Sequence, residues 1–265
     1  MFEFHKDKPR YFQYQYLTTK NYIIPFLEKH FLLEPGQKVL EIGSAEAGVL
    51  KAFTERGHEC TGIELQDSRI DLAKKFMKDE FKKNQVHFIN RDIYDIEPEK
   101  DLPYKFDLII LKDVIEHIPN QPAFAEKLKS FLKEKGKVFF AFPPWQMPFG
   151  GHQQMCTGKI LSKLPYFHLL PMPVYKGILR IFRQPPKKIT NLEEIKKTGI
   201  SIERFEKIMK GNNYTIDGKK HYLFNPIYKF KYKLKPRAQS RLISSIPYLR
   251  DFLTTGVYYL VTKTD

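Results

Sequence analysis

Four short segments place small, acidic or basic residues where a buried apolar run ends. In the first, VLEIGSAEAG at residues 39–48, the apolar run leads into a turn of small residues. A bound adenosyl group requires small residues there, because the backbone must approach the ligand closely. Glu41, at the end of the run, can accept hydrogen bonds from a cationic amine or orient the turn. The small residues of this candidate ligand-binding turn are Gly43, Ser44, Ala45, Ala47 and Gly48.

The next two segments each supply one carboxylate. Glu64 follows Glu41 by 23 residues and lies near the end of the apolar run at 60–65. An acid at this position can accept hydrogen bonds from both hydroxyls of a ribose. Asp92 follows a third apolar run and can accept a hydrogen bond from the exocyclic amine of adenine, with Ile93 packing near the ring. Together the two carboxylates predict an adenosine-binding edge.

The fourth segment, LKDVIEHIP at residues 111–119, follows another apolar run and brings Asp113, Glu116 and His117 together. His117 is a candidate general base. Such a base is needed only where the acceptor must lose a proton. A second and stronger candidate is His152, which follows a glycine pair in the loop PPWQMPFGGHQQ. We therefore expect His152, Asp113 and His117 to be the catalytic or acceptor-orienting residues.

Alternating strands and helices must position these residues. Strand after helix along the chain indicates βαβ units and a doubly wound, mostly parallel sheet. Two late strands after a final helix predict an antiparallel pair at one sheet edge. The expected strands cover residues 38–43, 60–65, 86–90, 106–112, 137–142, 213–225 and 256–263, and the expected helices cover 45–56, 68–83, 121–133 and 200–211.

Charge divides the chain into two parts. Residues 1–150 carry 23 basic and 23 acidic residues, so the other 22 basic and 7 acidic residues lie in 151–265. The whole net charge of +15 therefore belongs to the C-terminal part, which favours an anionic partner or a solvated basic face. The two cysteines form no zinc spacing, and we expect no metal and a cytoplasmic location.

Together and in this order, the four segments resemble the class I S-adenosylmethionine-dependent methyltransferases, in the small-molecule branch that includes ubiquinone-type enzymes. The resemblance implies a Rossmann-like sheet of seven strands with an antiparallel last strand. It implies S-adenosylmethionine as cofactor, with the turn at 43–48 binding the methionine end, Glu64 the ribose and Asp92 the adenine. The family usually has glycine where this chain has Ala45 and Ala47. The remaining expected cofactor contacts are Leu65, Lys112 and Tyr14.

The resemblance also implies one methyltransferase domain over residues 1–265. Its expected parts are an N-terminal helical cap (1–35), the cofactor-binding core (36–145) and an insertion that caps the acceptor (146–199). A C-terminal part (200–265) follows with a helix, edge strands and a basic insertion. Within that insertion, YKFKYKLK at 228–235 alternates strictly and is typical of a strand with lysines on one side.

These features favour methyl transfer to oxygen or nitrogen of a small-molecule, lipid-linked or saccharide-linked acceptor, with an anionic group among the options. The basic segment suggests peripheral contact with an anionic membrane. Two alternatives stay open: an RNA methyltransferase that uses the basic half, and a non-catalytic relative that binds the cofactor. Nucleic acid is the weaker choice, because Pro143-Pro144-Trp145 follows the fifth strand, whereas base-amino methyltransferases carry such a turn after the fourth.

Overall fold

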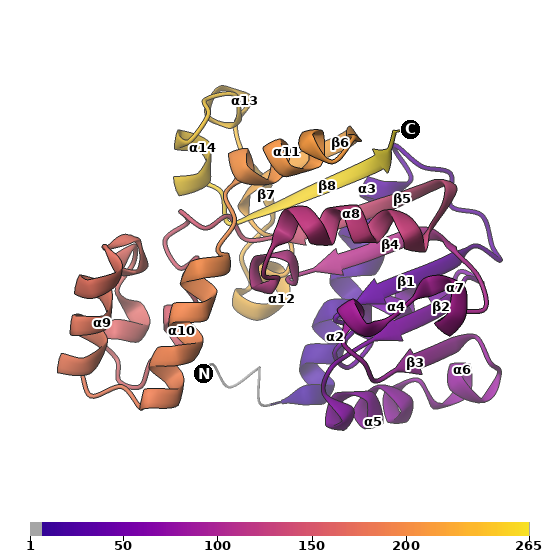
Figure 1. The fold of residues 1–265 in the computed structure, drawn as a ribbon, viewed down its shortest axis with the longest axis horizontal. Helices are drawn as coiled ribbons and strands as arrows, with labels where there is room; N and C mark the ends of the chain where they lie inside the picture. Colours follow the sequence, from indigo (N-terminus) through magenta and orange to yellow (C-terminus); the bar gives the residue numbers. More distant parts are fainter. Residues whose placement is uncertain (1–6, 265) are drawn as a thin grey trace.

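The computed structural model describes residues 7–264 and contains one eight-stranded sheet in the order β3-β2-β1-β4-β5-β8-β6-β7 (Figure 1). The first five strands are parallel, β8 is antiparallel to β5, and β6 is antiparallel to β8. The strands are β1 Lys38–Ile42, β2 Glu59–Ile63, β3 Val86–Ile89, β4 Phe106–Lys112, β5 Leu132–Phe142, β6 Tyr214–Phe224, β7 Arg237–Ala238 and β8 Gly256–Lys263.

The predicted doubly wound, mostly parallel fold is confirmed, with one strand more than expected. The extra strand, β7, is two residues long and pairs with β6 at the edge of the sheet. The strand β6 contains a register shift between Ile216 and Gly218. Since β6 remains paired with β8 on both sides of the shift, the chain does not reverse there.

Helices cover both faces of the sheet (Figure 1). The helices α8 and α11 pack on one face, and α3, α4 and α5 pack on the other. The α-helices are α2 Lys8–Thr18, α3 Ile24–Leu27, α4 Gly48–Thr54, α5 Asp67–Phe76, α6 Lys78–Lys82, α7 Pro98–Asp101, α8 Gln121–Phe131, α9 Met172–Ile181, α10 Pro186–Thr198, α11 Ile202–Gly211, α12 Tyr228–Tyr232, α13 Arg241–Ser244 and α14 Leu249–Phe252. A π-helical turn, η1 Thr19–Ile23, joins α2 to α3, and the 3-10 turns are η2 Ile93–Asp95, η3 Ile115–His117, η4 Gln153–Met155, η5 Leu161–Lys163 and η6 Phe167–Leu169.

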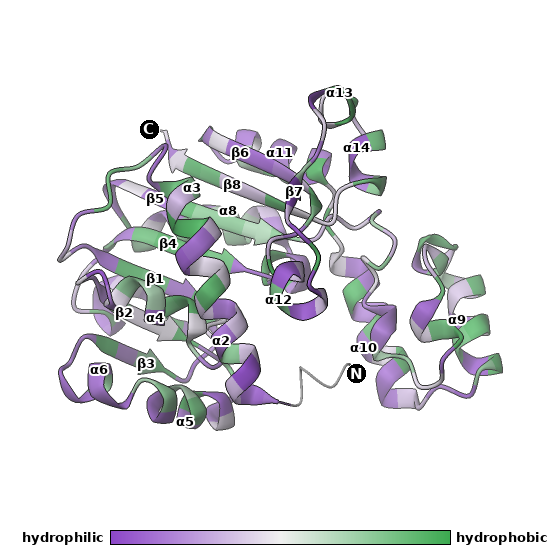
Figure 2. Cartoon of the chain, turned by 180° about the vertical axis from the view of Figure 1, so that it is seen from behind, coloured by the Kyte–Doolittle hydropathy of each residue, from purple (hydrophilic) through white to green (hydrophobic). Residues whose placement is uncertain are grey.

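The central strands are apolar on both sides because each side faces a helical layer. Successive residues of a strand point to opposite faces. Phe140 packs against Phe205 of α11 with ring centroids 5.0 Å apart, whereas Phe139 packs against Phe26 of α3 at 5.9 Å. Figure 2 shows the resulting hydrophobic colour along β4 and β8 in the middle of the sheet. This rigid core fixes the carboxyl ends of the strands, where the candidate site residues lie.

Residues 146–199 form a helical insertion beyond the carboxyl end of the sheet. The helices α9 and α10 enclose a small apolar core of their own, which includes Phe167, Tyr175 and Leu192. Trp145 packs at the base of this insertion, with its ring 4.7 Å from that of His168. A methyl group added at Gly199 would lie 2.3 Å from the indole. Trp145 is therefore a packing residue, and it does not line the large pocket described below.

The strand predicted for 228–235 is wrong: residues 228–232 form the short helix α12, and Lys233 ends it with a φ of 58°. Alternating aromatic residues also satisfy helical spacing, since positions i and i+4 lie on one face of a helix. The rings of Tyr228 and Tyr232 are accordingly 5.2 Å apart. Phe230 stacks on Tyr14 of α2 at 6.2 Å, which holds α12 against the N-terminal helix. Tertiary contacts therefore decide the structure of this segment.

Within residues 7–264, no helix combines the length and the apolar composition that crossing a bilayer requires.

Candidate active site

A pocket of about 760 Å³ opens at the carboxyl ends of β1 and β4, between the sheet, α2, α10 and α12. Its volume lies within the range of small-ligand sites. Nine residues proposed from the sequence line it: Glu41, Gly43, Ser44, Ala45, Gly48, Lys112, Asp113, His117 and His152. Five others do not line it: Tyr14, Glu64, Leu65, Asp92 and Ile93.

Glu64 fixes the turn that forms one end of the pocket. One carboxylate oxygen accepts a hydrogen bond from the Ala45 backbone N–H at 2.9 Å, and the other accepts from the Gln66 N–H at 3.0 Å. Gly43 and Ser44 donate their backbone N–H groups to the carbonyl of Ile63. Since Glu64 is buried and both of its oxygens bind backbone, it couples the turn after β1 to the turn after β2.

The two alanines that replace the family's glycines lie in the left-handed region. The φ of Ala45 is 48° and that of Ala47 is 65°. A side chain in this region costs about 1–2 kcal/mol per residue, because Cβ approaches the following carbonyl oxygen. The hydrogen bond from Ala45 to Glu64 opposes this cost at one of the two positions.

Two buried polar atoms of the turn region have no hydrogen-bond partner among the described residues. They are Oε2 of Glu41 and Oγ of Ser44. Burial raises the pKa of Glu41 well above its ordinary value, although Lys112 opposes the shift. A cationic group placed beside Glu41 would restore its negative charge and satisfy the free oxygen. These atoms therefore fit the amine of a methionine moiety.

The N-terminal helix α2 covers the turn directly. Lys8 forms an ion pair with the buried Glu46 at 2.6 Å. A methyl group added at Gly48 would lie 2.4 Å from the carbonyl oxygen of Phe12, so only glycine permits this approach. Tyr11 lines the pocket, whereas Tyr14, which the sequence suggested as a cofactor contact, is not among the lining residues and stacks on Phe230 of α12.

The predicted adenine contacts lie around the strand ends next to the turn. Asp92 accepts a hydrogen bond from the Tyr94 N–H at 2.9 Å and begins the turn η2. Ile93 is buried in the core, and Leu65 is 66% exposed. The carboxylate of Asp92 is therefore partly engaged in local structure, and its contact with adenine stays a prediction, as do those of Leu65 and Ile93.

Lys112 and Asp113 form an ion pair of 2.5 Å at the end of β4. Burial alone would lower the pKa of Lys112, but Asp113 keeps it above the ordinary lysine value. The same attraction holds the pKa of Asp113 below its usual value in spite of burial. Asp113 has a φ of 57°, so the chain turns sharply at the end of β4.

Glu116, His117 and His152 form a cluster on the pocket wall. One ligand atom of each lies within 4.8 Å of the others, and the two imidazole centroids are 4.9 Å apart. Both carboxylate oxygens of Glu116 are buried without a hydrogen-bond partner. Burial and the neighbouring Asp113 raise its pKa well above the ordinary value. Two imidazoles and a carboxylate are ligands for divalent transition metals, although the sequence alone indicated no metal.

The sequence analysis expected residues 146–199 to cap the acceptor, but it named no individual residue of the far wall of the pocket. This wall consists of Asn191, Glu194, Ile195 and Thr198 of α10, with Tyr228, Lys231 and Tyr232 of α12. Burial lowers the pKa of Lys231 to about 8, and Asp113 opposes the shift. For the α12 residues, the only signal in the sequence was the basic excess of the C-terminal part, because the alternation at 228–235 indicated a strand.

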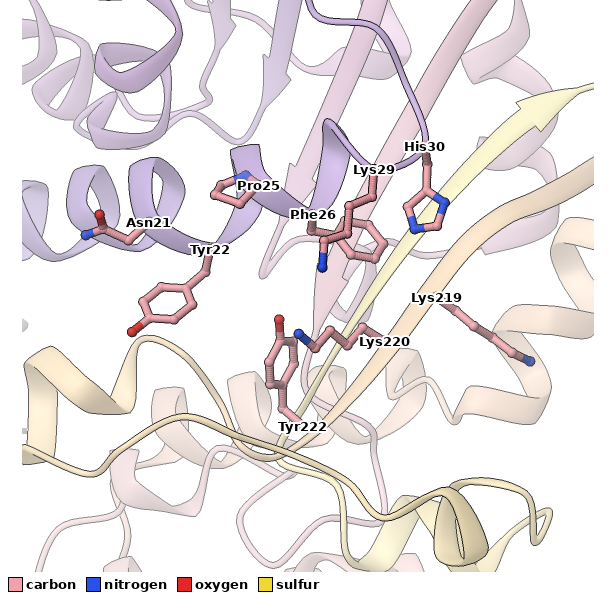
Figure 3. Close-up of a pocket in the computed structure, with 9 residues that line it drawn as sticks. All are labelled: Asn21, Tyr22, Pro25, Phe26, Lys29, His30, Lys219, Lys220 and Tyr222. Carbon is pink, nitrogen blue, oxygen red and sulfur yellow. The ribbon is translucent and has the colours of Figure 1, made fainter.

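A second, smaller pocket of about 280 Å³ lies away from the site, between α3 and β6 (Figure 3). The cationic side chains Lys29, Lys219 and Lys220 surround it. Burial and Lys29 lower the pKa of Lys220. Lys219 is paired with Glu206 at 2.9 Å. No buried charged side chain in its lining is left unpartnered, so nothing there indicates a built ligand site.

Comparison with protein families gives one match over most of the chain: a family model described as a methyltransferase domain matches residues 13–171. Among curated proteins, a ubiquinone biosynthesis O-methyltransferase of Coxiella burnetii is 27% identical over 118 residues, which is 44% of this chain and 48% of the relative. The corresponding enzyme of Idiomarina loihiensis is 28% identical over 117 residues, or 44% and 46%. The chain therefore spans about half the length of these curated relatives.

Solved structures share the fold at low sequence identity. A phosphoethanolamine N-methyltransferase of Haemonchus contortus, in complex with S-adenosyl-L-methionine, has a TM-score of 0.56 and 15% identity, with 92% of this chain and 53% of that chain covered. Magnesium protoporphyrin IX methyltransferase from Synechocystis, with bound S-adenosylhomocysteine (SAH), also has a TM-score of 0.56, with 15% identity and coverage of 100% and 89%. At these identities the likeness supports the fold alone.

We predict that Gly48→Ala weakens the binding of SAH at least tenfold. The added methyl group collides with backbone, so α2 must move away from the turn. Isothermal titration calorimetry measures the effect. Gly177→Ala in α9 is the matched control, because nothing lies within 4 Å of the added methyl group. An unchanged affinity in Gly48→Ala would show that the contact between α2 and the turn does not shape the site.

We also predict that the cluster of Glu116, His117 and His152 binds added Zn²⁺, which would occupy the imidazole nitrogens and so block any acid–base role of these histidines. Calorimetric titration of the wild type should show one site, and His152→Ala should weaken it at least tenfold because one of three ligands is lost. His87→Ala serves as the control, since His87 is exposed on β3. Absence of Zn²⁺ binding, or an equal loss in His87→Ala, would contradict the prediction.

Proposed function

This chain belongs to the methyltransferase domain family, and from that membership we propose that it transfers the methyl group of S-adenosylmethionine to an oxygen or nitrogen of a small-molecule, lipid-linked or saccharide-linked acceptor. One observation carries the proposal. A single pocket joins the small-residue turn after β1 to the wall that holds His117 and His152. A cofactor at the turn and an acceptor at the wall would therefore share one enclosed space, as a direct transfer requires.

The residues of the turn fit the cofactor. Oε2 of Glu41 and the hydroxyl of Ser44, which have no partner among the described residues, could bind the methionine moiety. Gly43 and Gly48 lack the side chains that would collide with Val114 and Phe12. Glu64 orders the turn through Ala45, and its contact with the ribose remains part of the proposal. S-adenosylmethionine supplies an activated methyl group, so the chain has only to bind, orient and exclude water.

In the proposed reaction, a lone pair of the acceptor forms a bond to the methyl carbon while the carbon–sulfur bond breaks. SAH leaves with that electron pair. Where the acceptor is a hydroxyl, its proton moves to an imidazole nitrogen, and we assign this role to His152. The rings of His117 and His152 lie side by side on the pocket wall, with their centroids 4.9 Å apart.

The surroundings of the two histidines support this assignment. Loss of hydration in the pocket lowers the pKa of His117, although Asp113 opposes the shift. His152 lies in the left-handed region, with a φ of 53°, directly after the glycine pair at 150–151. This sharp bend places the imidazole on the wall of the pocket. Asp113 and His117 act here by orienting the acceptor and the base.

Oxygen is the favoured acceptor atom. The curated relatives are O-methyltransferases by name, and a histidine base is useful only for an acceptor that must lose a proton. Lys231 and Arg69 also line the pocket and favour an acceptor that carries an anionic group. RNA is less well supported, because residues 228–232 fold over the pocket as α12 and not as an open basic strand.

We predict that His152→Ala lowers kcat by about 10²–10⁴-fold, the usual contribution of a general base, with a smaller change in KM. Transfer of radiolabelled methyl groups to a panel of phenols, catechols and amines, with and without a phosphate group, measures the reaction. Protonation of the base should make the wild-type rate fall as the solution is acidified, and His152→Ala should lose this dependence.

The control for this experiment is His87→Ala, which should retain full activity with every acceptor. An acceptor that His152→Ala methylates at the wild-type rate would exclude His152 as the base. If no compound in the panel is methylated although SAH binds, the chain is the cofactor-binding relative and not an enzyme of this acceptor class.

A further inference from the structure

The segment between β7 and β8 buries charged side chains and exposes apolar ones. In LRDFL, at residues 249–253, the charged Arg250 and Asp251 are buried, whereas the apolar side chains point outward. The side chain of Leu242 is 74% exposed and that of Tyr248 is 70% exposed. The six exposed apolar side chains, here called the α13–α14 patch, are Leu242, Ile246, Tyr248, Leu249, Phe252 and Leu253.

The patch is fixed to the core by its buried charges. Arg250 donates to Glu203 and to Glu206 of α11, both at 2.9 Å. Asp251 accepts a hydrogen bond from the backbone N–H of Ile202 at 2.9 Å. The backbone N–H of Tyr248 also donates to Glu203. The exposure of the apolar side chains therefore belongs to an anchored structure and is not that of a frayed loop.

Unpaired cations precede the patch in sequence. Lys233, Lys235, Arg237 and Arg241 are exposed, and none of them forms an ion pair with any residue in the described range 7–264. The single acid between residues 228 and 253 is Asp251, which is fully buried. Within residues 228–253, exposed apolar side chains and cations therefore occur without an exposed acid.

The helix α9 of the insertion adds a second surface on which apolar side chains and a cation are exposed. Ile181 is 77% exposed and Val174 is 50% exposed, and the exposed Arg180 lies beside them in sequence. Both α9 and the α13–α14 pair project beyond the carboxyl end of the sheet, on the side where the pocket opens (Figures 1 and 2). Tyr166 of the insertion contacts Phe252 of the patch, with ring centroids 6.2 Å apart.

We propose that the α13–α14 patch and α9 dock this chain onto the surface of a bilayer that contains anionic phospholipids. Exposed aliphatic side chains enter the boundary between headgroups and acyl chains, and the cations that precede the patch in sequence attract the headgroups. This inference deepens the proposed function, since a surface-bound enzyme would meet a lipid-linked acceptor at the pocket. Its test does not depend on methyl transfer.

Two other occupants fit the surface less well. A second copy in a two-fold dimer would bring the same cations face to face, and their repulsion opposes association. Single-stranded RNA would use the cations, but it binds through stacking on aromatic side chains. Four of the six patch residues are aliphatic. Of these three occupants, the bilayer is the one that matches both the aliphatic and the cationic side chains of the surface.

The test is co-sedimentation of the full chain with vesicles of phosphatidylcholine, alone or mixed with phosphatidylglycerol. We expect binding to the mixed vesicles, little binding to phosphatidylcholine alone, and weaker binding at high salt. Arg237→Gln with Arg241→Gln should weaken binding about 25-fold, at roughly fivefold for each cation. Leu242→Ser with Leu249→Ser should weaken it by about tenfold or more.

A matched control removes an apolar side chain and two cations elsewhere, through Leu32→Ser, Lys82→Gln and Lys83→Gln at exposed positions. It should bind vesicles like the wild type. Failure of the wild type to bind the mixed vesicles, equal binding to phosphatidylcholine alone, or an equal loss in the control would overturn the inference. SAH calorimetry on the same samples separates the two claims, because its failure counts against the proposed function and not against docking.

Discussion

The carboxylate of Glu64 is the interaction on which the site depends. Its two oxygens bind the backbone N–H groups of Ala45 and Gln66 and so tie together the turns that end β1 and β2. Ala45 and Ala47 hold a left-handed backbone that alanine adopts only at a cost. The buried carboxylate of Glu64 is a fixed hydrogen-bond acceptor, and it helps to keep that backbone in place. The buried oxygen Oε2 of Glu41, which has no hydrogen-bond partner among the described residues, then lies beside a turn of fixed shape.

Around this turn, the pocket is built from two parts of the fold. The sheet and its two helical layers supply the cofactor end of the pocket, and their apolar strands fix its geometry. The insertion with α10 and the excursion with α12 supply the acceptor end. Lys231, which no core element carries, therefore comes to lie near Asp113. In our proposals, acceptor choice and surface docking both reside in these two additions.

The sequence predicted the sheet because strands buried on both faces leave an unmistakable apolar run, as in Phe139 and Phe140. It also predicted the turn and the residues after β4, since parallel strands end at one edge. It failed for residues 228–235, where alternation fits a strand and a helix alike and the stacking of Phe230 on Tyr14 decides. The sequence could not show whether Tyr11 or Tyr14 of α2 faces the pocket, because the rotation of α2 depends on contacts with residues far away in the sequence.

Calorimetric titration of SAH into the wild type and into Glu64→Ala tests the central claim most directly. We expect micromolar binding to the wild type and a loss of at least tenfold, about 1.4 kcal/mol, in the variant. Glu34→Ala, at an exposed position before β1, should bind like the wild type. Absence of wild-type binding, or an unchanged affinity in Glu64→Ala, would contradict the account that Glu64 holds the turn in its cofactor-binding shape.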